Sequence, residues 1–259
     1  MTYKFIKYQA PDRIAHITLN RPDKRNAFNG ELIAELKNAF SQAEKDENVK
    51  VIILNANGKV FSAGADLEYL QQLQKNTYKQ NLGDSTQLAK LLKQIYTLKK
   101  IVIAQIQGHA IAGGCGLATV CDFSFAVPEA QFGYTEVKIG FIPAIVMIFL
   151  LRKIGEAKSK ELLLTGKLID AMTAKDYGLI NFVSDAKNIK SDVERFAETL
   201  CEETSAESLK QTKNMISKVQ GMSLDESLKF AAEMNAQARS KEDCKKGIAS
   251  FLNKEKIVW

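Results

Sequence analysis

The chain has 259 residues, of which 46% are hydrophobic and 25% charged, and its formal net charge is +6. These values are ordinary for a folded protein, so they exclude an intrinsically disordered chain and allow one large domain or a domain with an appended piece. The positive balance suits anionic partners such as phosphate groups, but it does not select one.

The apolar segments are short. None approaches the roughly 18 residues that a membrane-spanning helix needs. The longest apolar run, Phe141 to Leu151, includes Pro143 and predicts a buried helix. Residues 1–5 hold no apolar core of a secretion signal, so we expect a cytoplasmic protein with no membrane partner.

Cysteine and histidine usage argues against metal and disulfide frameworks. The chain has two histidines and four cysteines, and no two cysteines form a C-x-x-C pair. We therefore expect no metal site and free, mostly buried thiols. The thiols are those of Cys115, Cys121, Cys201 and Cys244.

Strand and helix patterns alternate along the first 155 residues or so. Runs rich in β-branched residues predict strands at 3–8, 14–19, 49–54, 101–106 and 123–127. Helical spacing covers 31–46 and 67–98, with a break expected near Asn81-Leu82-Gly83, and a further helix is expected from Leu117. Such alternation predicts an α/β fold whose parallel strands are joined by right-handed crossovers.

Helical patterns dominate after about Gly155. They cover 159–164, 173–177, 190–201, 205–219, 224–238 and 242–252. We therefore expect a core that contains the sheet, followed by a helical C-terminal region.

Two turns that contain glycine each follow a predicted buried strand. They are Phe61 to Asp66 and Gly108 to Gly116. Small residues let a ligand approach the backbone, and the second turn opens a helix whose first N–H groups are free. One N–H from each turn would form an oxyanion hole, in which each donor typically contributes about 2.7–4 kcal/mol. From the glycine spacing alone, ordinary tight turns fit equally well.

Several segments together resemble the crotonase (enoyl-CoA hydratase/isomerase) superfamily, with the spacing kept along essentially the whole chain. They are Asn20-Arg21-Pro22, Asn26-Ala27-Phe28, Phe61-Ser62-Ala63-Gly64-Ala65-Asp66-Leu67, Gly113-Gly114-Cys115-Gly116-Leu117-Ala118, Cys121-Asp122, Gln131-Phe132-Gly133, Glu136-Val137, Gly140 and Pro143. The resemblance implies a spiral core of repeated β-β-α turns over residues 1–200. It also implies a helical region over residues 201–259 that assembles a homotrimer or a dimer of trimers.

The resemblance also implies a site. Ala63 and Gly113 would supply the oxyanion N–H groups and Glu136 would act as the catalytic acid–base. No separate cofactor is implied, because the substrate itself carries coenzyme A as a thioester. The residues implied to contact coenzyme A are Lys24, Arg25, Ala27, Ala63, Gly64, Ala65, Asp66 and, in a neighbouring subunit, Phe251 and Lys254.

Gly116 is the main departure from this pattern. Typical enoyl-CoA hydratases have a glutamate there and a second one at the position of Glu136, and two carboxylates can share the placing of a water and the movement of its proton. This chain keeps Glu136 alone. We expect apolar neighbours to shield it and raise its pKa, which suits acid–base work. The expected neighbours are Phe132, Ile139, Phe141 and Ile142.

The segment after Pro143 is a second departure, because relatives have a glycine-rich run where this chain has Ala144 to Phe149. Together with Gly116, this segment resembles bacterial hydratases that act on branched 3-methylglutaconyl-type thioesters in leucine breakdown. The main expectation is therefore an enoyl-CoA hydratase (a lyase) of fatty acid or leucine catabolism. On a methylglutaconyl thioester, the distal carboxylate of the substrate would act where the glutamate is missing.

Four alternatives stay open. A Δ3-Δ2 enoyl-CoA isomerase needs one base, and a decarboxylase needs little beyond the oxyanion hole. An RNA-binding crotonase scaffold would need a basic first helix, but acidic residues offset Lys37, Lys45 and Lys50, so no nucleic-acid partner is expected. A catalytically inactive scaffold is the fourth, because of Gly116.

Overall fold

The computed structural model describes residues 2–259 and centres on a six-stranded sheet with the order β1-β2-β3-β4-β6-β9. The strands are β1 (Ile6–Gln9), β2 (Ile14–Leu19), β3 (Val51–Ala56), β4 (Ile101–Ile106), β6 (Phe123–Ala126) and β9 (Phe182–Val183). β1 runs antiparallel to β2, and every other neighbouring pair is parallel. The predicted α/β fold with parallel strands is confirmed.

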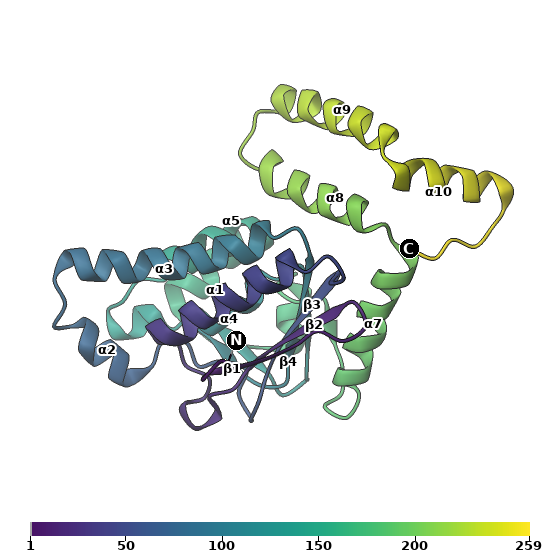
Figure 1. Cartoon of the computed structure of the whole chain (residues 1–259). Coiled ribbons are helices and arrows are strands. Elements are labelled where there is room, and N and C mark those ends of the chain that lie inside the picture. Colours follow the sequence, from purple (N-terminus) through teal and green to yellow (C-terminus); the bar gives the residue numbers. More distant parts are fainter. Residues whose placement is uncertain (1) are drawn as a thin grey trace.

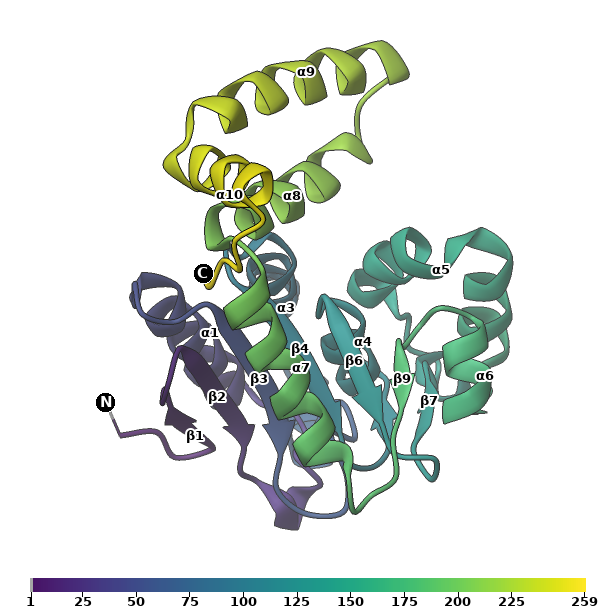
Figure 2. The same ribbon diagram turned by 90° about the vertical axis from the view of Figure 1, so that its right-hand side faces the viewer.

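Helices cover both faces of this sheet. α1 (Gly30–Lys45) and α3 (Tyr78–Thr97) pack on one face, while α7 (Ile189–Glu203) crosses the other (Figure 2). Strands buried on both faces need continuous apolar runs rather than alternation. The four residues from Val51 to Leu54 are such a run, with no exposed surface.

The break between the second and third helices differs from the prediction. α2 (Leu67–Leu73) ends before residues 74–77, and Asn81 to Gly83 lie inside α3. The start of α3 is fixed by a capping box, in which Thr77 Oγ1 accepts from the backbone N–H of Gln80 and the Gln80 side chain caps Thr77 in return. Gly83 is tolerated because a Cβ there would meet nothing within 4 Å.

Two further boundaries differ around the site. α4 (Gly113–Thr119) begins at Gly113, four residues before the predicted Leu117. α5 (Ala144–Thr165) begins after Pro143, so the first three residues of the apolar run at 141–151 are not helical. Phe141 and Ile142 are 53% and 68% exposed, because the short helix η2 (Glu136–Ile139) ends at Gly140 in a left-handed turn with φ 74°.

A second, small sheet joins the two glycine turns to the rest of the molecule. It pairs β7 (Gln131–Gly133) with β5 (Ala110–Ile111) on one side and with β8 (Ile169–Asp170) on the other. A single bridge from Ser62 to Ala110 connects the first glycine turn to it. The turns therefore lie side by side although some fifty residues separate them in sequence.

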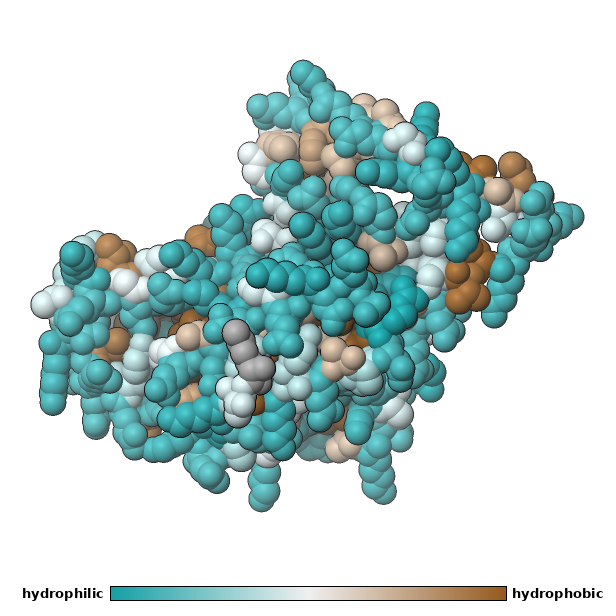
Figure 3. All heavy atoms as spheres, in the orientation of Figure 1, coloured by the Kyte–Doolittle hydropathy of each residue, from teal (hydrophilic) through white to brown (hydrophobic). Residues whose placement is uncertain are grey.

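The C-terminal arm consists of α8 (Ala206–Val219), α9 (Leu224–Ser240) and α10 (Glu242–Asn253), and it stands apart from the sheet (Figures 1 and 2). Neither α9 nor α10 has a buried residue. Apolar atoms gather on the arm around α10 in Figure 3. The large apolar side chains of α10 are exposed: Ile248 by 53%, Phe251 by 83% and Leu252 by 73%. The predicted boundary at residue 201 lies near the end of α7.

An ion pair joins the arm to the core, and its lysine is buried. Lys213 of α8 is 6% exposed, and its Nζ lies 2.6 Å from Oδ2 of Asp122, which follows the short helix α4. The ammonium also donates to the carbonyls of Ile95 and Lys100. A lysine buried this deeply needs such partners, because an unpaired buried charge is costly.

The remaining helices are η1 (Pro22–Lys24) and α6 (Ala171–Asp176). No helix of residues 2–259 is both long and apolar enough to cross a membrane. The four cysteines are free, and all but Cys244 are buried, which confirms the predicted free thiols.

Candidate active site

The site is built on the loop from Arg21 to Phe28, and a buried asparagine holds this loop in place. Asn26 has no exposed surface and a left-handed backbone with φ 53°. Its Oδ1 accepts from the Arg21 N–H at 2.9 Å, and its Nδ2 donates to the carbonyls of Asn57 and Val60 at 2.9 and 2.8 Å. The loop is thereby tied to the segment that follows β3.

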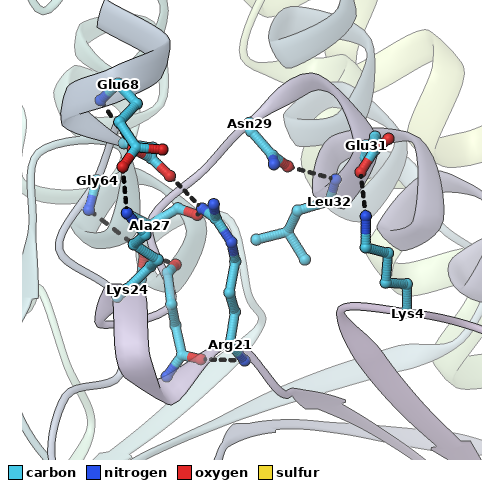
Figure 4. Close-up of polar contacts among 12 residues, drawn as sticks. Lys4, Arg21, Lys24, Ala27, Asn29, Glu31, Leu32, Gly64 and Glu68 are labelled. Carbon is cyan, nitrogen blue, oxygen red and sulfur yellow. Dashed lines mark hydrogen bonds and ion pairs between the residues drawn. The ribbon is translucent and has the colours of Figure 1, made fainter.

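An ion pair braces this loop against the first glycine turn. The Arg21 guanidinium pairs with Asp66 and donates to the carbonyl of Ala27 at 3.0 Å (Figure 4). Asp66 also caps α2 by accepting from the Glu68 N–H at 2.9 Å. Burial acts to raise the pKa of Asp66, but hydrogen bonds from Arg21 and Glu68 outweigh it and leave the pKa lowered. The carboxylate expected to border coenzyme A is thus buried and already engaged.

The first glycine turn offers the N–H of Ala65 as a candidate donor, because the N–H of the predicted Ala63 is engaged. The Ala63 N–H donates to the carbonyl of Arg25 at 3.0 Å, so it is not available. Phe28 forms a parallel bridge with Ala65, in which the Phe28 N–H donates to Gly64 and the Asp66 N–H donates to Phe28. In such a bridge the N–H of Ala65 points away from Phe28. The Ala65 N–H group has no acceptor within residues 2–259.

The second candidate donor is the N–H of Gly113. Gly113 is the first residue of α4, where an N–H has no acceptor in its own helix. The preceding Ala112 has φ 51° and ψ −123°, and its own N–H donates to Gly133 at 2.8 Å. A Cβ placed on Gly64 would lie 3.3 Å from the Gly113 nitrogen and 2.9 Å from the Ala112 Cβ. The two glycine turns therefore meet at position 64, and only glycine fits there.

Glu136 is the first residue of η2 and lies three residues after Gly133. The Ala112 N–H, just before α4, donates to the Gly133 carbonyl, and this hydrogen bond brings Glu136 close to the start of α4. Its Oε2 is buried and has no hydrogen-bond partner in the part of the chain described. Burial raises the pKa of this carboxyl. The predicted direction is therefore right.

The expected shield of Glu136 is mostly wrong. Phe132 is fully buried, but Ile139, Phe141 and Ile142 are 71%, 53% and 68% exposed. The carboxyl lies instead near the first turn of α4. Burial raises the pKa of Cys115 to about 12, and the nearby charge of Glu136 adds to this.

The space beside Gly116 is filled. A Cβ at position 116 would lie 2.2 Å from Cγ1 and 3.0 Å from Cβ of Val146, a buried residue of α5. Leu92 Cδ1 would be 3.9 Å away. Val146 therefore occupies the place of the first side-chain carbon of a residue at position 116, and an apolar contact lies where the glutamate of typical hydratases begins.

The predicted coenzyme A contacts divide into two groups. Lys24 and Arg25 are exposed beside the glycine turn, where Lys24 pairs with Glu68 (Figure 4). Ala27 is buried beneath them, 5% exposed, and its N–H donates to Lys24. Phe251 and Lys254 are exposed on the arm and are not brought to this loop within one chain (Figures 1 and 2).

Sequence reasoning named Ala65 as a coenzyme A contact but not as a donor, and it missed the contact of Val146 with Gly116 and the ion pair of Arg21 with Asp66. Gly64 is the reason for the first, because its φ of 86° turns the chain between two alanines that look equivalent in sequence. Within the described residues, no group of three or more His, Cys, Asp or Glu side chains is placed to hold a metal ion.

Comparison with known proteins agrees with this architecture. Residues 9–259 match the family model described as "Enoyl-CoA hydratase/isomerase". A Thermus thermophilus protein named "Putative enoyl-CoA hydratase" is 38% identical over 241 residues, which cover 93% of this chain and 95% of that protein. The "Crotonyl-CoA hydratase" of Syntrophomonas wolfei is 30% identical, with 99% and 98% covered.

Solved structures show the same fold. The crystal structure of an enoyl-CoA hydratase from Shewanella pealeana superposes with a TM-score of 0.93 at 29% identity, covering 99% of this chain and 96% of that one. The fold, the paired glycine turns and these matches place the protein in one class. The chain belongs to the enoyl-CoA hydratase/isomerase, or crotonase, family.

Proposed function

We propose that this protein adds water to the double bond of a 2-enoyl thioester of coenzyme A. One observation carries the proposal: three polar groups that have no partner among residues 2–259 occur in one connected region, namely the N–H groups of Ala65 and Gly113 and Oε2 of Glu136. The hydratase names of the relatives support the reaction class.

Each group has a part in the reaction. The two N–H groups donate to the thioester oxygen and stabilise the negative charge that it gains when water attacks C3. Glu136, ionised, takes a proton from the attacking water. A proton then passes from its carboxyl to C2 as the enolate collapses, so one water is added and the carboxylate is regenerated. Burial of Glu136 suits this cycle, because a raised pKa makes its acid form a usable proton store.

The substrate that fits best is an uncharged 2-enoyl thioester. A 3-methylglutaconyl-type thioester is the branched alternative, and its distal carboxylate would have to take the place of the missing glutamate. Val146 packs into that place, and a carboxylate against a buried valine would lose its solvation without gaining a partner.

A Δ3-Δ2 enoyl-CoA isomerase is the second candidate function, and the contact of Val146 with Gly116 favours it. Moving a proton between C4 and C2 needs one base and no bound water. Glu136 with the two N–H groups would suffice for that reaction as well.

For the rest of the substrate, we propose that Lys24 and Arg25 attract the phosphates of coenzyme A, because they are exposed cations beside the glycine turn. The arm would contribute Phe251 and Lys254 to the site of a neighbouring copy. A homotrimer or dimer of trimers would also cover the apolar residues of the arm, which are large and solvent-exposed in the single chain.

Glu136→Gln tests the proposal. The change is nearly isosteric, so the variant should bind acyl-CoA normally while its turnover of crotonyl-CoA falls by about 10²- to 10⁴-fold, the usual contribution of a general acid–base. Glu129→Gln is the matched control, because Glu129 is an exposed glutamate on the loop before β7. Parallel assays with a trans-3-enoyl thioester separate isomerase from hydratase. Near-normal turnover by Glu136→Gln on both substrates would exclude Glu136 as the base.

A further inference from the structure

Phe28 contacts both halves of the proposed oxyanion hole. Its backbone forms the bridge with Ala65, through the Phe28 N–H to the Gly64 carbonyl at 2.6 Å and the Asp66 N–H to the Phe28 carbonyl at 3.0 Å. Its ring lies against the other half, because Cε2 and Cδ2 would be 3.2 and 3.3 Å from a Cβ on Gly113. One residue therefore touches both donor loops.

Phe28 is itself held firmly. It is 3% exposed, and it lies between the buried Asn26 and the start of α1. Asn29, the next residue, caps α1 by accepting from the Leu32 N–H at 2.9 Å (Figure 4). Movement of Phe28 would therefore require movement of the start of this helix.

The ring contact is tight. A Cβ on Gly113 would lie closer to the ring than ordinary van der Waals contact, so the ring fills the space that a side chain at position 113 would need. The ring thus borders the Gly113 turn, and the backbone bridge of Phe28 holds the Ala65 turn.

We propose that Phe28 is a positioning residue that sets the separation of the Ala65 and Gly113 N–H groups, an inference that rests on the proposed function. It does not touch the substrate. Its ring fixes the Gly113 turn, while its backbone fixes the Ala65 turn. Because a displacement of about 1 Å in a reacting geometry can cost about 10²-fold in rate, removing the ring should damage catalysis out of proportion to stability.

The experiment compares Phe28→Ala, Phe28→Leu and a matched core variant, Phe40→Ala. Phe40 is a fully buried phenylalanine about three turns into α1, the helix that begins just after Phe28. Infrared difference spectra of butyryl-CoA labelled with ¹³C at the thioester carbonyl report how strongly the two N–H groups polarise that bond. The saturated acyl chain cannot be hydrated, so the bound state is stable during the measurement.

The wild-type protein should shift the carbonyl band to lower wavenumber on binding. Phe28→Ala should lose most of this shift and about 10²-fold in kcat with a smaller change in KM, and Phe28→Leu should recover part of both. Phe40→Ala should keep the full shift and a near-normal kcat while it lowers the melting temperature.

Two results overturn the inference, and they are distinguishable. If both Phe28 variants keep the wild-type shift and kcat, the ring does not position the donors, and the proposed function stands. If the wild-type protein itself shows no shift, the proposed function fails and the inference fails with it. Should Phe28→Ala not fold, Phe28→Leu carries the test alone.

Discussion

The contact of Gly116 with Val146 yields a stability prediction that the geometry makes quantitative. In Gly116→Ala, the new Cβ would lie 2.2 Å from Val146 Cγ1. Carbon atoms rest at about 3.5–4.0 Å, so the helices must move apart by more than about 1 Å. Overpacking of this kind costs about 1–3 kcal/mol, and the better helix propensity of alanine offsets up to about 1 kcal/mol of it.

Val146→Gly has the opposite defect. It removes three buried carbons, at about 0.8 kcal/mol each, and adds a glycine in the first turn of α5 at up to about 1 kcal/mol, which gives a loss of about 3 kcal/mol. In the double variant, the methyl group on residue 116 enters the space that the valine leaves. The two changes should therefore couple favourably by about 1–3 kcal/mol, within the range seen for residues in contact.

Urea unfolding of the wild-type protein, both single variants and the double variant measures this coupling. Additive losses, with coupling below about 0.5 kcal/mol, would refute the packing argument. The Val146→Gly variant also allows a test of the hydration reaction. Gly116→Glu combined with Val146→Gly should raise hydration of crotonyl-CoA relative to isomerisation of a 3-enoyl thioester, because it supplies the second carboxylate.

Other changes have expected outcomes. Lys213→Met should lower the free energy of unfolding, read from urea midpoints, by up to about 3 kcal/mol, because it leaves the partly buried Asp122 carboxylate without the Lys213 cation. Ala112→Gly should raise the melting temperature, since glycine relieves a φ of 51° that costs an alanine about 1 kcal/mol or more; a lower melting temperature would contradict this. Glu136 must be ionised to act as a base and burial raises its pKa, so kcat should fall with decreasing pH around a midpoint above the usual value of about 4.3. A pH profile with its midpoint at or below that value would exclude the buried base.

Much of the fold could be predicted because it depends on local patterns. Strands such as β4 (Ile101–Ile106) are rich in β-branched residues and bounded by turns, and α1 follows helical spacing. The sequence prediction placed the break between α2 and α3 at Asn81 to Gly83, because glycine is a poor helix former. The break lies earlier, because the reciprocal hydrogen bonds between Thr77 and Gln80 start α3 there.

The site was harder to predict because it depends on contacts distant in sequence. The choice between Ala63 and Ala65 is made by the carbonyl of Arg25 and the bridge to Phe28, nearly forty residues away. Likewise, Gly116 looks like an opening in sequence, and only the packing of α5 shows that Val146 closes it. The role of Glu136 stays a prediction from the family resemblance, and the structure adds that its Oε2 is buried without a partner in the described residues.

A crystal structure with bound butyryl-CoA tests the central claim most directly. The thioester oxygen should lie within about 2.7–3.2 Å of both the Ala65 and the Gly113 nitrogens, with the Glu136 carboxylate facing the C2 and C3 atoms of the acyl chain. A thioester oxygen bound to other donors, or an acyl chain that runs away from Glu136, would contradict the proposed site.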